Sequence, residues 1–218
     1  MLFQTNAGDF QVELNPTGNS NLQPLVDNFL AYVTSDRWVG AVINRAASTF
    51  TGDPFVVQLG GFRADSIKAA DVPFGGLPGV PTFDPVVVDA DLDGTIDFDT
   101  TGLSNTRGEV ALALSAGNPN SGTSSWFVNL SDNSFLDAQG FVPFARIPDL
   151  SFFDDLESGP QLDLSTQVGQ PSSLAYTDVP VVNGGEDLVV IEGVVVVPEP
   201  AALVLAFVAT AVGACRRR

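Results

Sequence analysis

The fold is decided by the stretch Gly108-Glu-Val-Ala-Leu-Ala-Leu-Ser-Ala-Gly-Asn-Pro-Asn-Ser-Gly-Thr-Ser-Ser-Trp-Phe-Val-Asn-Leu-Ser-Asp-Asn-Ser-Phe-Leu-Asp137. It holds a β-rich run at 108–114, a loop of small residues, a second run with two aromatic residues at 125–130, and a Phe-Leu-Asp turn. Short runs bounded by clusters of Gly, Pro, Asn and Ser are typical of β-strands. The stretch therefore predicts two strands with a small-residue loop between them.

Upstream of this stretch, the spacing of the apolar residues changes from that of a strand to that of a helix. Apolar and polar residues alternate over 10–14, which indicates a strand with one buried face. Apolar residues then recur at helical spacing over 22–33, with Pro24 tolerated in the first turn, so an amphipathic helix is predicted there. Two further β-rich runs follow at 39–45 and 54–62.

The rest of the chain alternates between loops and short apolar runs. Residues 63–107 are rich in Pro, Gly and Asp and are expected to form a long acidic excursion. We predict a strand at 141–147, a short helix near 150–156 and a closing strand at 187–197. Many short strands with at most two helices favour a mostly β fold, a closed antiparallel barrel capped by one or two helices.

Charge and rare residue types exclude several functions. Twenty-six acidic residues against nine basic ones give a net charge of −17, which repels phosphate groups and argues against nucleic-acid binding. The chain has no His and one Cys, Cys215. A Ser-His-Asp or Cys-His nucleophile and a His/Cys zinc site are therefore excluded. Any chemistry must use Arg, carboxylates, hydroxyls or the backbone.

Four short motifs carry a family signature. They are Leu103-Ser-Asn-Thr-Arg-Gly108, Val110-Ala-Leu-Ala113, Trp126-Phe-Val-Asn-Leu130 and Phe135-Leu-Asp137. In this order and spacing they resemble the cyclophilins, the peptidyl-prolyl cis-trans isomerases. The resemblance implies an eight-stranded closed barrel over residues 1–197, with 63–107 as an excursion. It also implies that the chain acts on proline-containing polypeptides and requires no cofactor.

Isomerisation of an X-Pro bond needs no nucleophile, base or metal, because the obstacle is amide resonance with a barrier of about 18–20 kcal/mol. A fixed cationic donor beside an apolar pocket weakens that resonance as the imide nitrogen becomes pyramidal. Arginine suits this role because its donors stay charged in an apolar cleft. The resemblance places the catalytic arginine at Arg45 and an orienting amide at Gln58. The alternative for Arg45 is a strand-end residue in a surface ion pair.

The resemblance also implies a substrate-binding surface. Its residues would be Phe55, Val56, Leu114, Ser125, Phe127, Leu136 and Phe141. The backbone at Leu114 would pair with an extended substrate, as an added strand does. Three positions depart from the family pattern: Asn44 replaces a His, Ser125 replaces a Gln, and Phe141 stands where His or Tyr is common. Taken without the family, Phe55 would be a core aromatic residue.

A repeat of acidic residues in the excursion predicts a metal site. The acids are Asp89, Asp91, Asp93 and Asp97. With Gly94, they reproduce the first nine positions of a calcium loop, whose ligands are oxygen atoms. Position twelve is Thr100, so the bidentate acid is missing unless Asp99 substitutes for it. The alternative to a structural calcium ion is a solvated acidic loop with a turn at Asp93-Gly94.

The C-terminal segment has the composition of a membrane anchor. Residues 201–215 are apolar, three arginines follow them, and Pro198-Glu-Pro200 precedes them. This pattern resembles the PEP-CTERM sorting tail of bacterial exported proteins, which implies a short apolar helix within 198–218 and an exosortase-type protease that removes it. At about 1.5 Å per residue, the helix reaches only about 22 Å of a hydrocarbon core of about 30 Å. The alternatives are a buried C-terminal helix and an uncleaved anchor.

The tail also sets the expected location. A sorting tail implies export to the cell envelope or surface, yet the sequence opens on a strand without a signal peptide, so we expect the true start to lie upstream of Met1. The leading prediction is a peptidyl-prolyl cis-trans isomerase that assists the folding of exported proteins. A catalytically weak proline-peptide binding module at the cell surface is the alternative, and an adhesion-type β-domain is the third hypothesis.

Overall fold

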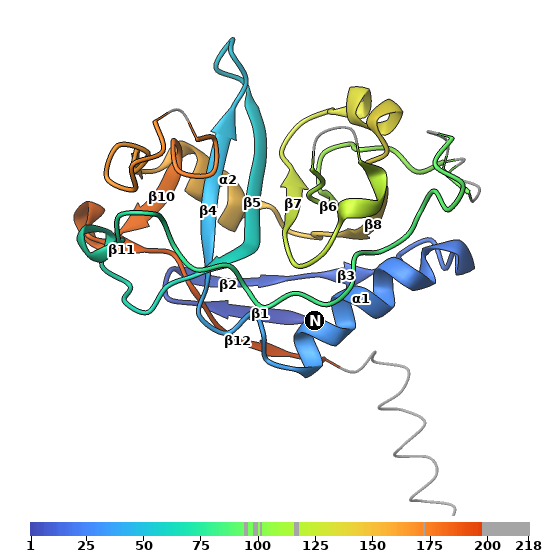
Figure 1. The fold of residues 1–218 in the computed structure, drawn as a ribbon, viewed down its shortest axis with the longest axis horizontal. Helices are drawn as coiled ribbons and strands as arrows, with labels where there is room; N and C mark the ends of the chain where they lie inside the picture. The colour runs from blue at the N-terminus through green and yellow to red at the C-terminus, as the bar shows by residue number, and fades with distance from the viewer. Residues whose placement is uncertain (94–95, 98–99, 101, 116–117, 172, 198–218) are drawn as a thin grey trace, which may run out of the picture.

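The computed structural model describes residues 1–197 apart from 94–95, 98–99, 101, 116–117 and 172. These residues form a mostly β fold with two α-helices, α1 (Gln23–Thr34) and α2 (Ser151–Ser158) (Figure 1). The strands are β1 (Leu2–Thr5), β2 (Gly8–Gln11), β3 (Glu13–Leu14), β4 (Ala41–Ser48), β5 (Pro54–Arg63), β6 (Glu109–Leu112), β7 (Trp126–Asn129), β8 (Pro143–Arg146), β9 (Gln161–Leu162), β10 (Val179–Val182), β11 (Asp187–Leu188) and β12 (Ile191–Val195). Short 3-10 helices are η1 (Ser20–Leu22), η2 (Ala69–Asp71), η3 (Pro119–Ser121), η4 (Ser134–Gln139) and η5 (Asn183–Gly185).

The strands pair in three antiparallel sheets. The largest has the order β3-β8-β6-β7-β5-β4, and the others are β12-β1-β2 and β11-β10-β9. A single bridge between Val42 and Val190 links β4 to the chain just before β12. The amide of Gly40 supports this link by donating to the Ile191 carbonyl at 2.7 Å. The described pairing is thus divided among three sheets and does not form one continuous ladder.

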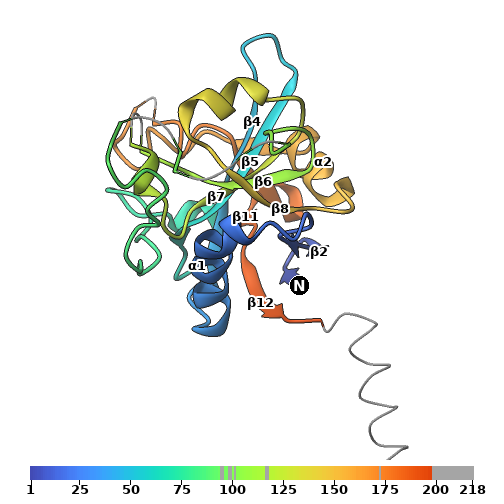
Figure 2. The same cartoon turned by 90° about the vertical axis from the view of Figure 1, so that its right-hand side faces the viewer.

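An aromatic core lies between the sheets and α1. Four of its fully buried side chains are Phe3, Phe29, Trp38 and Trp126. The ring centroids of Phe29 and Trp38 lie 4.5 Å apart, and those of Phe3 and Trp126 lie 5.7 Å apart. Full burial of one such side chain stabilises a fold by about 1.5–3 kcal/mol. Figures 1 and 2 show α1 beside the core, at the end of the molecule opposite the tip of the β4–β5 hairpin.

Most predicted elements are present, and the differences arise where a strand changes partner. The helix predicted over 22–33 is α1, and the runs at 39–45 and 54–62 are β4 and β5. The strand predicted over 10–14 is divided, because β2 pairs with β1 whereas β3 pairs with β8. The closing strand over 187–197 is likewise divided into β11 and β12, which belong to different sheets. The sequence analysis did not predict β9 and β10.

The excursion over 63–107 carries a single short helix, η2, among its described residues. It stays close to the core through apolar side chains, of which Val80, Val86 and Val88 are buried. The hydroxyl of Tyr32 on α1 accepts a hydrogen bond from the Phe83 amide at 2.9 Å. This Pro/Gly-rich segment is therefore held in place by contacts with the main core and α1, since its described residues after β5 form no strand of their own.

The predicted sorting tail, with its apolar helix at 201–215, lies outside the described residues. Within residues 1–197, as far as they are described, no helix combines the length and the apolar character needed to cross a membrane. The tail therefore stays a prediction from sequence.

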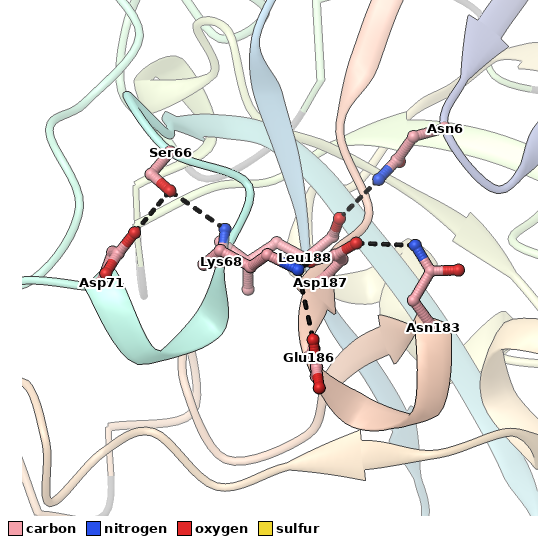
Figure 3. Close-up of polar contacts among 8 residues, drawn as sticks. All are labelled: Asn6, Ser66, Lys68, Asp71, Asn183, Glu186, Asp187 and Leu188. Carbon is pink, nitrogen blue, oxygen red and sulfur yellow. Dashed lines mark hydrogen bonds and ion pairs between the residues drawn. The ribbon is translucent and has the colours of Figure 1, made fainter.

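A buried carboxylate fastens β11 to the excursion (Figure 3). Asp187 is 3% exposed, and its Oδ1 lies 2.6 Å from the Nζ atom of Lys68. Its Oδ2 accepts a hydrogen bond from the Asn183 amide, also at 2.6 Å. The Asn183 hydrogen bond and then the Lys68 ammonium lower the pKa of Asp187 below its ordinary value. Because β11 pairs with β10, this carboxylate joins segments far apart in the sequence.

The Asp187→Asn substitution tests this anchor. Since the folded-state pKa is below the unfolded value of about 3.9, the carboxylate stabilises the fold above that value and loses its contribution as the pH falls through the folded pKa. We expect the variant to have a lower urea midpoint than the wild type at about pH 7, and the gap to narrow near pH 2. An equal gap at both pH values would contradict this account.

Candidate active site

Four strands of the large sheet place the predicted catalytic residues in one row. Arg45 on β4 is the Cα partner of Gln58 on β5, and Gln58 is the partner of Phe127 on β7. Phe127 is in turn the partner of Ala111 on β6. Directly paired residues of antiparallel strands have their side chains on the same face of the sheet. Arg45, Gln58 and Phe127 therefore share one face.

The neighbouring row has the opposite orientation. Ala46 pairs with Val57, Val57 with Val128, and Val128 with Val110, and all four side chains are buried in the main core. Because side chains alternate between the two faces along a strand, the row with Arg45 faces away from that core. The main core thus forms a rigid floor beneath the candidate site.

A separate apolar cluster covers the outward face, and we call it the outer cluster. Its members are Ala47, Val56, Ala111, Phe127 and Leu136, with Phe55, Ala113 and Phe141 packed against them and partly exposed. The rings of Phe127 and Phe141 meet edge to face with centroids 5.6 Å apart. The rings of Phe55 and Phe135 stack at 6.0 Å. Five of the predicted binding residues are therefore together in one cluster.

The Arg45 side chain lies half-buried on this face without an ionic partner among the described residues. Its Nε atom is buried and has no hydrogen-bond partner there. Burial lowers the pKa of Arg45, and the negative charge of Asp178 partly opposes this effect. By contrast, Arg107 and Arg146 form close ion pairs with Asp154 and Glu109. Arg45 thus has an unsatisfied donor group in apolar surroundings, a geometry that suits an electrostatic catalyst.

The Gln58 amide is held by a residue that departs from the family pattern. Its Nε2 atom donates to the Oγ atom of Ser125 at 3.1 Å. The two strands can approach this closely because Gly60 and Gly61 follow on β5. A Cβ atom at Gly60 would lie 2.6 Å from the Ser124 carbonyl oxygen, and the positive φ of +80° also favours glycine. Ser125 therefore fixes the orientation of Gln58.

Leu114 takes a different position from the other predicted residues. It follows the end of β6, and its side chain packs against the main core rather than the outer cluster. The preceding amide, that of Ala113, donates to the Ser125 carbonyl at 2.8 Å. The Leu114 side chain thus lies apart from the outer cluster, and the pairing of its backbone with a substrate stays a prediction.

A buried asparagine network supports the outer cluster, and the sequence analysis did not single it out. Asn105 donates to the Asp137 carboxylate at 2.7 Å and to the Phe141 carbonyl at 2.8 Å. Asn129 donates to the Asn105 oxygen at 3.1 Å, and Asn133 donates to the Asn129 oxygen at 2.9 Å. All three asparagines are at most 1% exposed.

This network connects the segments that carry the outer cluster. Asn133 also donates to the Phe55 carbonyl at 3.0 Å, so β5 is tied to η4, the element that bears Leu136. Asn105, Asn129 and Asp137 all lie in the motifs that indicated the family. The signal that could have found them is the presence of three asparagines in otherwise buried segments, since buried amides require partners.

The acidic repeat in the excursion is partly assembled. Carboxylate oxygens of Asp89, Asp91 and Asp97 lie within 4.8 Å of one another, and Asp89 is 1% exposed. Asp93 is not part of this group, although its amide donates to the Asp91 carboxylate at 3.3 Å. Gly94 and Asp99 lie outside the described residues. Three of the four predicted ligands are thus close enough to share one cation.

Comparisons with known proteins show which sequences and folds this chain is similar to. Residues 1–167 match the sequence family described as cyclophilin type peptidyl-prolyl cis-trans isomerase/CLD. A peptidyl-prolyl cis-trans isomerase of Acinetobacter baylyi is 30% identical over 149 residues, which cover 66% of this chain but only 63% of that protein. The peptidyl-prolyl cis-trans isomerase cyp18 of Streptomyces antibioticus is 29% identical over 184 residues, which cover 81% of this chain and 89% of the relative.

Solved structures show the same fold at lower identity. A cyclophilin-type peptidyl-prolyl cis-trans isomerase of Cryptosporidium parvum superposes with a TM-score of 0.54 and 18% identity, covering 91% of this chain and 97% of the other. A second crystal structure of that protein, obtained in the presence of the dipeptide Ala-Pro, also has a TM-score of 0.54. At this identity the likeness shows the mostly β fold alone.

The Asn105→Ala substitution tests the asparagine network that supports the outer cluster. It removes the side-chain donor to the Phe141 carbonyl and the oxygen that accepts from the buried Asn129 amide, and a buried polar group left without a partner costs about 1–3 kcal/mol. We expect the free energy of unfolding from urea titration to fall by about this amount. Asn21→Ala, at an exposed position, is the matched control. Equal stability of both variants would show that the network is dispensable.

Proposed function

This chain belongs to the cyclophilin-type peptidyl-prolyl cis-trans isomerase family, and from that premise we propose that Arg45 is its electrostatic catalyst for rotation of X-Pro bonds. The observation that carries the proposal is the half-buried guanidinium of Arg45, which shares a sheet face with Phe127 and has no ionic partner among the described residues. A structural arginine in apolar surroundings would be expected to have a carboxylate partner. We therefore propose that the Arg45 guanidinium is available to a ligand.

In the proposed mechanism, the outer cluster receives the proline ring. Phe127 and Leu136 form its buried part, and Phe141 leans edge to face on Phe127. The Arg45 guanidinium then donates to the imide nitrogen as that atom becomes pyramidal and the C–N bond loses double-bond character. Burial lowers the pKa of Arg45. A guanidinium nevertheless stays protonated at neutral pH in proteins.

Gln58 and Leu114 would position the substrate. The Ser125 hydroxyl accepts from Nε2 of Gln58, so the Gln58 carbonyl oxygen is the group proposed to contact the substrate. The backbone at Leu114 follows β6 and would pair with an extended peptide as an added strand. Proline-containing polypeptides are therefore the proposed substrates, and exported proteins are the proposed clients.

A binding module with weak turnover is the second candidate, because of the family departures. Phe141 brings no hydrogen-bond donor to the pocket, and Asn44 is 1% exposed with its amide directed to the Ala175 carbonyl at 3.3 Å. Asn44 thus serves the packing of β4 rather than the outer face. Both features leave proline binding intact and remove polar groups that could assist catalysis.

The Arg45→Ala substitution separates these two functions. Loss of one preorganised donor to a transition state lowers kcat by about 100–1,000-fold in other enzymes, and we expect a fall of this order in kcat/KM for a short X-Pro peptide. Isomerisation would be followed by NMR exchange between the cis and trans peptide signals. The control is Arg146→Ala on β8 of the same sheet, which removes an exposed ion pair. If the wild-type chain does not accelerate exchange, the enzyme proposal fails and the binding function replaces it.

We also propose a structural calcium ion in the excursion. Support comes from the shared 4.8 Å neighbourhood of Asp89, Asp91 and Asp97 and from the preference of calcium for several oxygen ligands. The Asn120 amide organises the same loop, since its oxygen accepts from the amides of Val88 and Asp89 at 2.7 and 2.9 Å. An ion here would link the excursion to the loop between β6 and β7.

Calorimetric titration with calcium tests this site. We expect saturable heat with the wild-type chain and its loss in Asp91→Asn, because the variant removes one of three clustered carboxylates. Asp65→Asn, an exposed acid in the same excursion, is the control and should titrate as the wild type does. Absence of heat with the wild type would leave the loop as a solvated acidic turn.

The cell envelope or surface is the proposed location. The support is the composition of residues 198–218, with Pro-Glu-Pro, an apolar run and terminal arginines. We propose that the tail anchors the domain transiently at the membrane and is removed by an exosortase-type protease. Fractionation of producing cells, with the intact mass of the protein measured in each fraction, is the corresponding experiment.

A further inference from the structure

The β4–β5 hairpin ends in a fully exposed aromatic side chain, Phe50, whose exposure is 108% of the reference value. The turn that presents it is ordered by its own hydrogen bonds. The Thr49 amide donates to the Asp53 carbonyl at 2.7 Å, and the Thr51 hydroxyl donates to the Asp53 carboxylate at 2.6 Å. Gly52 supplies the left-handed backbone conformation, with φ of +86°, that closes the turn. The ring is therefore held in solvent by a defined turn.

The other exposed phenylalanines differ from Phe50. Phe135, which is 58% exposed, stacks on Phe55 of the outer cluster. Phe74, which is 84% exposed, lies against Gly169, where a Cβ atom would be 2.3 Å from its ring. A solvent-exposed ring at a hairpin tip contributes nothing to folding through burial, since stabilisation scales with the apolar area removed from water. A contact with another polypeptide would remove this apolar area from water.

Phe50 belongs to the same hairpin as two residues of the candidate site, Arg45 and Gln58. From the Arg45–Gln58 pair toward the tip, the pairing of β4 with β5 continues to the pair Ser48 and Pro54, with a register shift before it. Phe50 lies five positions after Arg45, which corresponds to at most about 16 Å at about 3.3 Å per residue. Figures 1 and 2 both show the hairpin tip projecting beyond the rest of the molecule.

We infer that Phe50 is a second contact for polypeptide substrates, one that binds a bulky apolar side chain about five residues away from the isomerised proline. An extended peptide has the same rise per residue as a strand, so it covers the distance from Arg45 to Phe50 with about five residues. The inference rests on the proposed function, since it assigns to this hairpin a role in selecting unfolded clients. Unfolded chains expose apolar side chains that folded proteins bury, and the Phe50 ring favours the former.

Four substrates and three variants test the inference. The substrates are a four-residue X-Pro peptide, a thirteen-residue peptide with Leu five positions on either side of proline, and versions of the long peptide with Ser at one or both of these positions. The variants are Phe50→Ser, Phe74→Ser as the matched control, and Arg45→Ala. We expect Phe50→Ser to lower kcat/KM for the Leu peptide about tenfold relative to the short peptide, through KM, as a loss of roughly 1.4 kcal/mol of apolar contact would do. Phe74→Ser should leave this ratio unchanged.

The outcomes distinguish the inference from the proposed function. Equal ratios in wild type and Phe50→Ser would overturn the inference while leaving the function of Arg45 in place. Absence of turnover of the short peptide by the wild type would overturn the proposed function itself. Sedimentation velocity completes the test: a wild-type dimer that Phe50→Ser converts to a monomer would assign the tip to contact between two copies of this chain, and the inference would be wrong.

Discussion

The register between β4, β5, β7 and β6 is the constraint on which the site depends. It places Arg45, Gln58 and Phe127 in one row, and the row beside it, with Val57 and Val128, fills the main core. A slip of one residue would exchange the two faces, because side chains alternate along a strand. The guanidinium would then lie in the aromatic core and the valines in solvent. Burial of the core therefore fixes the position of Arg45, the proposed catalyst, as well as the fold.

The outer face has two properties that each reduce the stability of the fold. It is apolar enough to lower the pKa of Arg45, and it leaves the buried Nε atom of Arg45 without a partner among the described residues. The asparagine network and the main core supply the rigidity for this arrangement, since they hold Phe55, Leu136 and Phe141 from behind. Stability and chemistry are thus divided between the two faces of one sheet. The arrangement is that expected of a preorganised site.

The three positions that depart from the family pattern make different contacts in the structure. Ser125 replaces an amide, yet its hydroxyl accepts the Gln58 amide and keeps that side chain oriented. Asn44 is buried and bonded to the Ala175 carbonyl, so its effect falls on strand packing. Phe141 makes the pocket more apolar through its contact with Phe127. The turn after β4, in contrast, carries the exposed Phe50 away from the core.

By itself, the sequence determined the mostly β class, the amphipathic helix α1 and most strands, because these depend on local periodicity and on motifs read in order. It also named five residues that the structure places together in the outer cluster, and their role in binding stays a prediction. It could not determine where β2 gives way to β3 or β11 to β12, since a change of pairing partner leaves the alternation along the strand intact. Only the tertiary structure decided that Arg45 has no ionic partner within the described part of the chain, that Ser125 orients Gln58, and that Asn105, Asn129 and Asn133 form one network. Each of these facts depends on distances between segments far apart in the chain, and such distances are set by packing rather than by sequence neighbours.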